Sequence, residues 1–160
     1  MKTILVAIDF SPVTDSVVAA AAELARSVQG RLFLLNVVPV PDLLGNVAIG
    51  INTAYIVGYR YQLAEAPDAA AVETEAERRA DGRLKHLAWS LPGLDVGTSV
   101  AAGDPAEEIL RVAREKSADF IMMGLHRHNS LYELFVGSTA HAVLKKAPCP
   151  VLMIPARPGA

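Results

Sequence analysis

The chain contains little of what marks several common protein classes. Its 160 residues include one cysteine, Cys149, which excludes an internal disulfide and makes the reducing cytoplasm the expected compartment. A net charge of −2 provides no electrostatic attraction for nucleic acid or for an anionic membrane surface. No apolar run is long enough to cross a bilayer, so the sequence predicts no membrane-spanning helix.

Aromatic residues are also scarce, at 6%, whereas hydrophobic residues of all kinds make up 52% of the chain. This hydrophobic content excludes a disordered protein, and a chain of this length can bury a full core. Because the apolar residues are mostly Ala, Leu and Val, we expect helices packed closely on a buried sheet. The length predicts a single domain over residues 1–157, with no room for a second catalytic domain.

Five short apolar runs have the pattern of strands that are buried on both faces of a parallel sheet. They cover residues 4–8, 32–38, 96–101, 120–123 and 151–154. Four segments with helical spacing of apolar residues separate them. This alternation predicts an α/β fold in which right-handed crossovers build a five-stranded parallel sheet with helices on both faces.

Residues that commonly begin or end helices flank two of the helical segments. Ser11 and Pro12 predict the start of the first helix, and Gly30 predicts its end. Asp104 and Glu107 form the pattern of a capping box at the start of the third. These residues set the expected boundaries between strands and helices.

Residues 39–67 have no sustained hydrophobic period and are predicted to form a long, variable loop. Loops of this length in compact domains usually serve as lids, binding loops or interface segments. Asp68 is predicted to cap the helix that follows. Glu75 and Arg79 have the spacing of an ion pair on the outer side of that helix.

Ligands of open parallel sheets bind beyond the carboxyl ends of the strands, where the strand order reverses. Asp9, Val37 and Gly124 lie at such ends and are expected to lie close together. The carboxylate of Asp9 can accept hydrogen bonds from sugar hydroxyls or a base amine, and the backbone of Val37 can contact a base edge. The alternative role of Asp9 is to cap the helix that follows it.

Another candidate site is the segment from Gly124 to the last helix, which ends in Gly137, Ser138 and Thr139. Glycine permits close approach of the backbone, the first amides of a helix are free to donate, and the two hydroxyls add further donors. These groups predict an anion site, with phosphate as the obvious anion. The alternative is a simple helix N-cap, for which Gly and Ser are equally suited.

Signatures of other nucleotide sites and of several enzyme classes are missing. The sequence has no P-loop, no Gly-x-Gly-x-x-Gly turn after the first strand, and no Gly-x-Ser-x-Gly nucleophile elbow. Four histidines do not combine with carboxylates at metal-ligand spacing: His86, His126, His128 and His141. The residues therefore favour a binding protein, with neither catalytic nor metal-ligating residues assigned.

These segments resemble the universal stress protein family. The characteristic loop of that family is Gly, two residues, Gly, nine residues, Gly, then Ser or Thr. Here Gly124, Arg127, Gly137 and Ser138 keep the spacing, with Arg127 in place of the second glycine. Other matching segments are ILVAIDFS, LLNVV, GDP and APCPVLMI, so that the resemblance covers nearly the whole chain except residues 39–67.

The resemblance implies a stress-response protein that binds ATP as a regulatory ligand, without defined catalytic turnover, and that dimerises through its last strand, residues 151–154. It implies adenine and ribose contacts from Ala7, Asp9 and Val37, a floor made by Met123 and Gly124, and phosphate contacts from Gly137, Ser138 and Thr139. Because metal-free ATP carries a charge of about −4 and few cations are expected nearby, Mg²⁺ is expected to accompany the phosphates.

The replacement of a loop glycine by Arg127 has two physical interpretations. The side chain can crowd the place where the backbone approaches phosphate, or its guanidinium can replace a lost amide contact. An alternative function is therefore a dimer of the same fold that binds no nucleotide and acts through protein partners. A slow ATPase ranks below both because no general base is evident, and the position of Ser138 and Thr139 is weak evidence for autophosphorylation.

Overall fold

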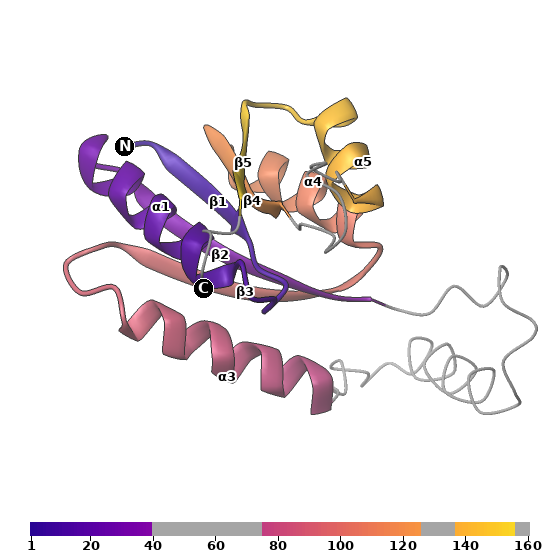
Figure 1. Cartoon of the computed structure of the whole chain (residues 1–160), viewed down its shortest axis with the longest axis horizontal. Coiled ribbons are helices and arrows are strands. Elements are labelled where there is room, and N and C mark those ends of the chain that lie inside the picture. The colour runs from indigo at the N-terminus through magenta and orange to yellow at the C-terminus, as the bar shows by residue number, and fades with distance from the viewer. Residues whose placement is uncertain (40–74, 126–136, 156–160) are drawn as a thin grey trace, which may run out of the picture.

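The computed structural model describes residues 1–39, 75–125 and 137–155 (Figure 1). Strands and helices alternate along these residues. They are β1 (Thr3–Ala7), α1 (Thr14–Ser27), β2 (Arg31–Pro39), α3 (Glu75–Trp89), β3 (Val96–Gly103), α4 (Pro105–Glu115), β4 (Phe120–Leu125), α5 (Ser138–Lys146) and β5 (Val151–Pro155). The five strands form one sheet in the order β3-β2-β1-β4-β5, and every neighbouring pair is parallel. The predicted α/β fold is confirmed.

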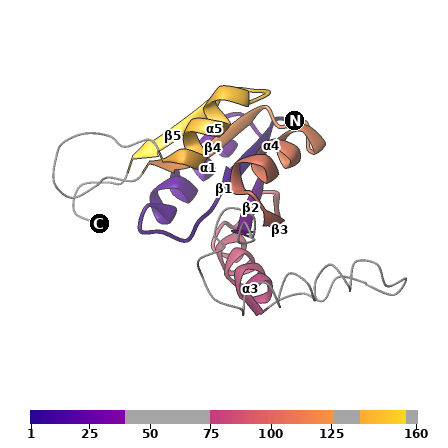
Figure 2. The same cartoon turned by 90° about the vertical axis from the view of Figure 1, so that its right-hand side faces the viewer.

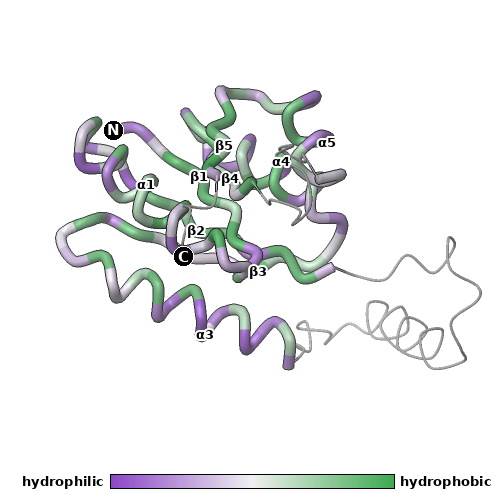
Figure 3. The backbone as a smooth tube through the Cα atoms, viewed as in Figure 1, coloured by the Kyte–Doolittle hydropathy of each residue, from purple (hydrophilic) through white to green (hydrophobic). Residues whose placement is uncertain are grey.

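Helices cover both faces of this sheet (Figure 2), and each face has its own hydrophobic cluster. Successive side chains of a strand point to opposite faces. Ile4 and Val6 of β1 therefore join the cluster beneath α1 and α3, whereas Leu5 joins the cluster beneath α4 and α5. Figure 3 shows hydrophobic residues along the strands, whereas hydrophilic residues recur along α3.

The strand order reverses beside β1. The chain runs from β1 outward to β2 and β3, then returns to place β4 on the other side of β1 and β5 at the far edge. Helix α1, which follows β1, and helix α5, which follows β4, therefore cover opposite faces of the sheet, and a space opens between them at the carboxyl edge.

The predicted start of the first helix is wrong by two residues. Helix α1 begins at Thr14, and no side chain in the described part of the chain caps it. The reason is a turn over residues 9–13, in which the Asp9 carboxylate accepts a hydrogen bond from the Ser11 amide at 3.0 Å. The Ser11 carbonyl in turn accepts from the Thr14 amide at 3.0 Å.

The helix ends agree better with the sequence. Asp104 caps α4, because its carboxylate accepts from the Glu107 amide at 2.9 Å. The predicted ion pair is confirmed on α3, where Arg79 Nε lies 3.0 Å from Glu75 Oε1. Near the end of α1, however, the left-handed residue is Gln29 and not Gly30.

Some predictions fall outside the described residues. These are the loop after Pro39, the helix cap at Asp68, and the domain limit at residue 157. In the part of the chain that the structure describes, no helix combines the length and apolar character needed to cross a membrane.

Candidate functional site

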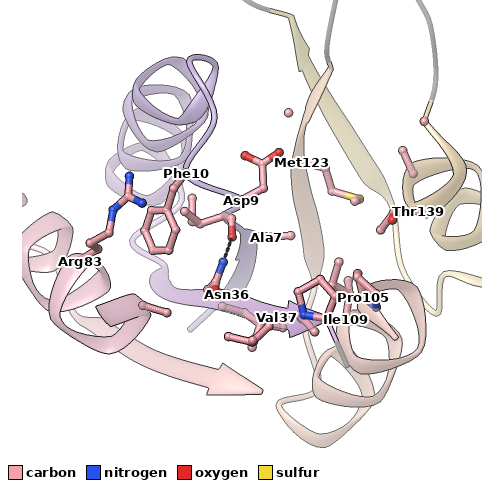
Figure 4. A pocket seen from close by; sticks show the side chains of 18 of the residues that line it. Ala7, Asp9, Phe10, Asn36, Val37, Arg83, Pro105, Ile109, Met123 and Thr139 are labelled. Atoms are coloured by element: carbon pink, nitrogen blue, oxygen red, sulfur yellow. Dashed lines mark hydrogen bonds between the residues drawn. The ribbon is translucent and has the colours of Figure 1, made fainter. Parts of the chain in front are cut away.

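A cleft with a volume of about 620 Å³ opens at the carboxyl edge of the sheet (Figure 4). The ends of β1, β2 and β4 form its floor, α3 contributes one wall, and the first turns of α4 and α5 contribute to the other side. Its size is typical of sites for small molecules, which are usually about 300 to 1,000 Å³. The cleft lies where the strand order reverses, as expected for a ligand site of this fold.

The cleft brings together almost all of the site residues predicted from the sequence. Those that line it are Ala7, Asp9, Val37, Met123, Gly124, Gly137, Ser138 and Thr139. Arg127 lies outside the described residues, so both interpretations of it stay open. That these residues bind a ligand stays a prediction.

Asp9 is an exposed carboxylate at the mouth of the cleft, directly after the end of β1. Its Oδ1 accepts from the Ser11 amide, which fixes the turn and the direction of the side chain. The alternative in which Asp9 caps the following helix is wrong, because α1 begins only at Thr14 and has no side-chain cap within the described residues.

A buried amide, Asn36, fixes the end of β1 from the neighbouring strand. The residue is only 8% exposed, and its Nδ2 donates to the Ile8 carbonyl at 2.7 Å. One residue earlier, the Leu35 carbonyl accepts from the Ile8 amide at 2.8 Å. Sequence reasoning missed Asn36, although a single polar residue inside the apolar run of β2 was a usable signal.

Gly137 is the N-cap of α5, at the side of the cleft away from α3. Its φ of −61° suits any residue, and a Cβ added there would meet no described atom within 4 Å. The described part of the fold therefore gives no reason for a glycine, whereas a ligand that approaches the backbone closely would give one. The first amides of α5 have no side-chain cap among the described residues, so this helix start can donate to an anion.

Gly124 has a different explanation, which lies in packing. It is part of β4, which continues to Leu125, and it pairs with Ile154 of β5. A Cβ added at Gly124 would overlap with Cγ1 of Val13, just before α1. Glycine is therefore required here by the contact between the start of α1 and β4, even though the residue also lines the cleft.

The wall formed by α3 carries cations that the sequence did not lead us to expect. Arg79 and Arg83 both line the cleft, on the wall opposite the start of α5, so the expectation of few cations near the phosphate position stays a prediction. Arg79 is paired with Glu75, and the Arg83 guanidinium lies 3.9 Å from the centroid of the Phe10 ring. The two arginines are four residues apart and share a helix face, but only the position of α3 against β2 and β3 brings that face to the cleft.

Comparisons with known proteins agree with this architecture. A model of the Universal stress protein family matches residues 1–155. The chain is 32% identical over 155 residues to the universal stress protein YxiE of Bacillus subtilis, covering 94% of this chain and 96% of the relative. It also resembles the structure of UspA from Lactobacillus plantarum, with a TM-score of 0.64, 26% identity, and coverage of 96% of this chain and 97% of that one.

A further structure with the same fold contains a nucleotide. It is the universal stress protein from Archaeoglobus fulgidus in complex with dAMP, with a TM-score of 0.57 and 20% identity. The alignment covers 96% of this chain and 98% of that one. At this level of identity the likeness shows the fold alone.

Proposed function

The chain belongs to the universal stress protein family, and from this premise we propose that it binds an adenine nucleotide in the cleft at the carboxyl edge of its sheet. The proposed ligand is ATP with Mg²⁺, and the proposed role is regulatory, in the cytoplasmic response to stress. The observation that carries the proposal is the start of α5, which has Gly137 at its tip and no side-chain cap from any described residue, and which opens into the same cleft as Asp9.

The proposed orientation of the nucleotide follows from the two sides of the cleft. The amides of Ser138 and Thr139 begin α5, and the positive end of the helix dipole favours phosphate there. Figure 4 shows Thr139 on the opposite side of the cleft from Arg83 and Phe10. With its phosphates at α5, the nucleotide would direct its ribose toward Asp9 and its base toward the backbone of Val37.

The cleft supports binding better than catalysis. Among the described residues that line it, Asp9 is the one carboxylate, and it already accepts a hydrogen bond from the Ser11 amide. A general base has to reach the proton of the attacking group. We therefore propose ATP as a ligand, and we expect phosphate release by the wild-type protein to equal that of a variant unable to bind it.

The experiment is calorimetric titration with ATP and Mg²⁺, together with thermal unfolding. A ligand at 100 times its dissociation constant stabilises the folded protein by about 2.7 kcal/mol. For a chain of this size that free energy raises the melting temperature by about 5 to 10 °C. Absence of both heat and stabilisation at millimolar nucleotide would refute nucleotide binding and favour the alternative, a dimer that acts through protein partners.

Gly137→Val is the variant that tests the phosphate position. We expect it to fold like the wild type, because its Cβ meets no described atom, and to lose nucleotide binding, because the side chain fills the approach to the α5 amides. Gly82→Val is the matched control: Gly82 also has open space at its Cβ but does not line the cleft. Equal affinity of the two variants would show that the phosphates bind elsewhere.

We further propose that the protein forms a homodimer through β5. Among the described residues this strand pairs with β4 alone, and it carries no charged residue. Its apolar residues from Val151 to Ile154 are only partly buried in the single chain. Uncharged edge strands of this kind are prone to association with a second strand or surface.

A further inference from the structure

The backbone of Phe10 has the left-handed conformation, with a φ of 58°. For a bulky side chain this conformation is strained, whereas glycine adopts it freely and asparagine with little cost. The turn after β1 would thus be more easily made with a small residue. Residues with a strained backbone of this kind tend to occur at ligand sites. The contacts of the Phe10 ring are therefore of interest.

The Phe10 ring is only half-buried, between the core and the cleft. It packs on the cluster beneath α1 and α3, and it lines the cleft. Arg83 lies over the ring, with its guanidinium carbon 3.9 Å from the ring centroid, a distance at which cation and ring attract. In Figure 4 the ring lies between Arg83 and the side chains of Asp9 and Asn36.

Two hydrogen bonds hold the backbone around Phe10. The Asp9 carboxylate closes the turn on the Ser11 amide, and Asn36 fixes the Ile8 carbonyl at 2.7 Å. The ring therefore stands on a rigid turn at the side of the cleft that faces away from α5. This is the side to which a nucleotide with its phosphates at Gly137 would direct its base.

We propose, on the basis of the proposed function, that the Phe10 ring is the surface against which the nucleobase packs, and that it favours purines over pyrimidines. Aromatic rings bind bases through their π faces, and the strength of this contact differs between bases because it depends on stacking. Arg83 holds the ring from its other side. Phe10 is thus a specificity-determining residue, and Arg83 is a positioning residue that acts through it.

The test compares the affinities for ATP and CTP, each with Mg²⁺, in the wild-type protein and in Phe10→Asn. Asparagine tolerates the left-handed backbone, so we expect the variant to fold, which its melting temperature checks. Loss of one base contact of this kind weakens binding roughly tenfold. We expect that loss for ATP, a smaller loss for CTP, and hence a lower ATP to CTP affinity ratio.

Arg83→Met tests the positioning role, with Arg78→Met as its matched control. Arg78 is on the same helix but does not line the cleft. Loss of a cation at an exposed ring is expected to weaken ATP binding about two- to fivefold. The control should leave both the affinity and the ATP to CTP ratio unchanged. If the two arginine variants bind ATP and CTP with equal affinities, the positioning role of Arg83 is refuted.

The possible failures are distinguishable. If the wild-type protein binds neither nucleotide, both the proposed function and this inference are wrong. If it binds ATP, and Phe10→Asn keeps both affinities unchanged, nucleotide binding stands and the role of Phe10 is refuted. A Phe10→Asn variant that loses affinity equally for ATP and CTP would also refute base selection by the ring.

Discussion

Gln29 and Ser117 have the same unusual backbone conformation, each with a φ of 49°. Each is the first residue after the C-cap of a helix, α1 and α4 respectively. The following amides, of Gly30 and Ala118, donate to the carbonyls of Ala25 and Ala113 at 2.8 Å. Both helices thus end in a Schellman motif whose left-handed position is usually glycine.

Glycine at these two positions should stabilise the protein. We expect Gln29→Gly and Ser117→Gly each to raise the free energy of unfolding by about 1 kcal/mol, because the left-handed conformation is unfavourable for other residues. Urea unfolding measures the change. Gln29→Ala and Ser117→Ala are the controls, and glycine variants no more stable than these would contradict the explanation.

At the scale of single residues, the sequence predicted best where the neighbours are local. The cap at Asp104 depends on an amide three residues away, and it was found. Gly30 was correctly placed near the end of α1, but for a different reason: a Cβ there would lie 2.8 Å from the Lys2 carbonyl oxygen. That contact comes from another part of the chain and leaves no local pattern.

The start of β1 is fastened to the start of β4 by Asp119. Its Oδ1 accepts from Lys2 Nζ at 2.7 Å, and its Oδ2 accepts from the Thr3 amide at 2.8 Å. The hydrogen bond from Lys2, followed by that from Thr3, holds the pKa of Asp119 below its usual range. A carboxyl whose pKa is lower in the folded state stabilises the fold above its unfolded-state pKa, near 4, and loses this effect as the pH falls further.

Asp119→Asn should therefore lower the melting temperature at pH 7. The difference from the wild type should shrink as the pH falls from about 4 through the lowered pKa of Asp119, because the carboxyl is then protonated in both states. Thermal unfolding between pH 2 and pH 7 measures this. A difference that persists unchanged at the lowest pH would show that the side chain acts without its charge.

Among the larger elements, strands were predicted to within two residues because buried apolar runs are continuous. The beginning of α1 was misplaced by two residues for a different reason: the turn at Phe10 and Ser11 depends on a left-handed conformation and a hydrogen bond, which the hydrophobic period does not indicate. The arginines of α3 were missed for another reason. Their place beside the cleft depends on which strands α3 covers, and this follows from the strand order.

The dimer can be tested on the whole molecule. Size exclusion with light scattering should give twice the chain mass of 17.0 kDa. Leu152→Lys should give the monomer, because a charge on β5 opposes association of its edge. Trp89→Lys is the control, since this residue is 90% exposed at the end of α3. A monomeric wild type, or a Leu152→Lys variant that remains dimeric, would contradict the proposed interface.

Eight of the site residues predicted from the sequence line one cleft in the fold. The sequence did not distinguish residues that packing requires from residues that only a ligand would require. Gly124 and Gly137 looked alike in the loop pattern. One is fixed by Val13, and the other has no described neighbour that requires it. Such a distinction depends on the atoms that surround each glycine in three dimensions, which the spacing of residues in the sequence does not reveal.

The open space beside Gly137 also bears on how such a protein can evolve. A single nucleotide change turns a glycine codon into one for alanine, valine or aspartate, and at position 137 the added Cβ would meet no described atom within 4 Å. If the protein binds a nucleotide as proposed, gene copies that lose the ligand and keep the fold are one mutation away. A side chain at position 124 would instead overlap with Val13 and disturb the packing of β4 against the start of α1.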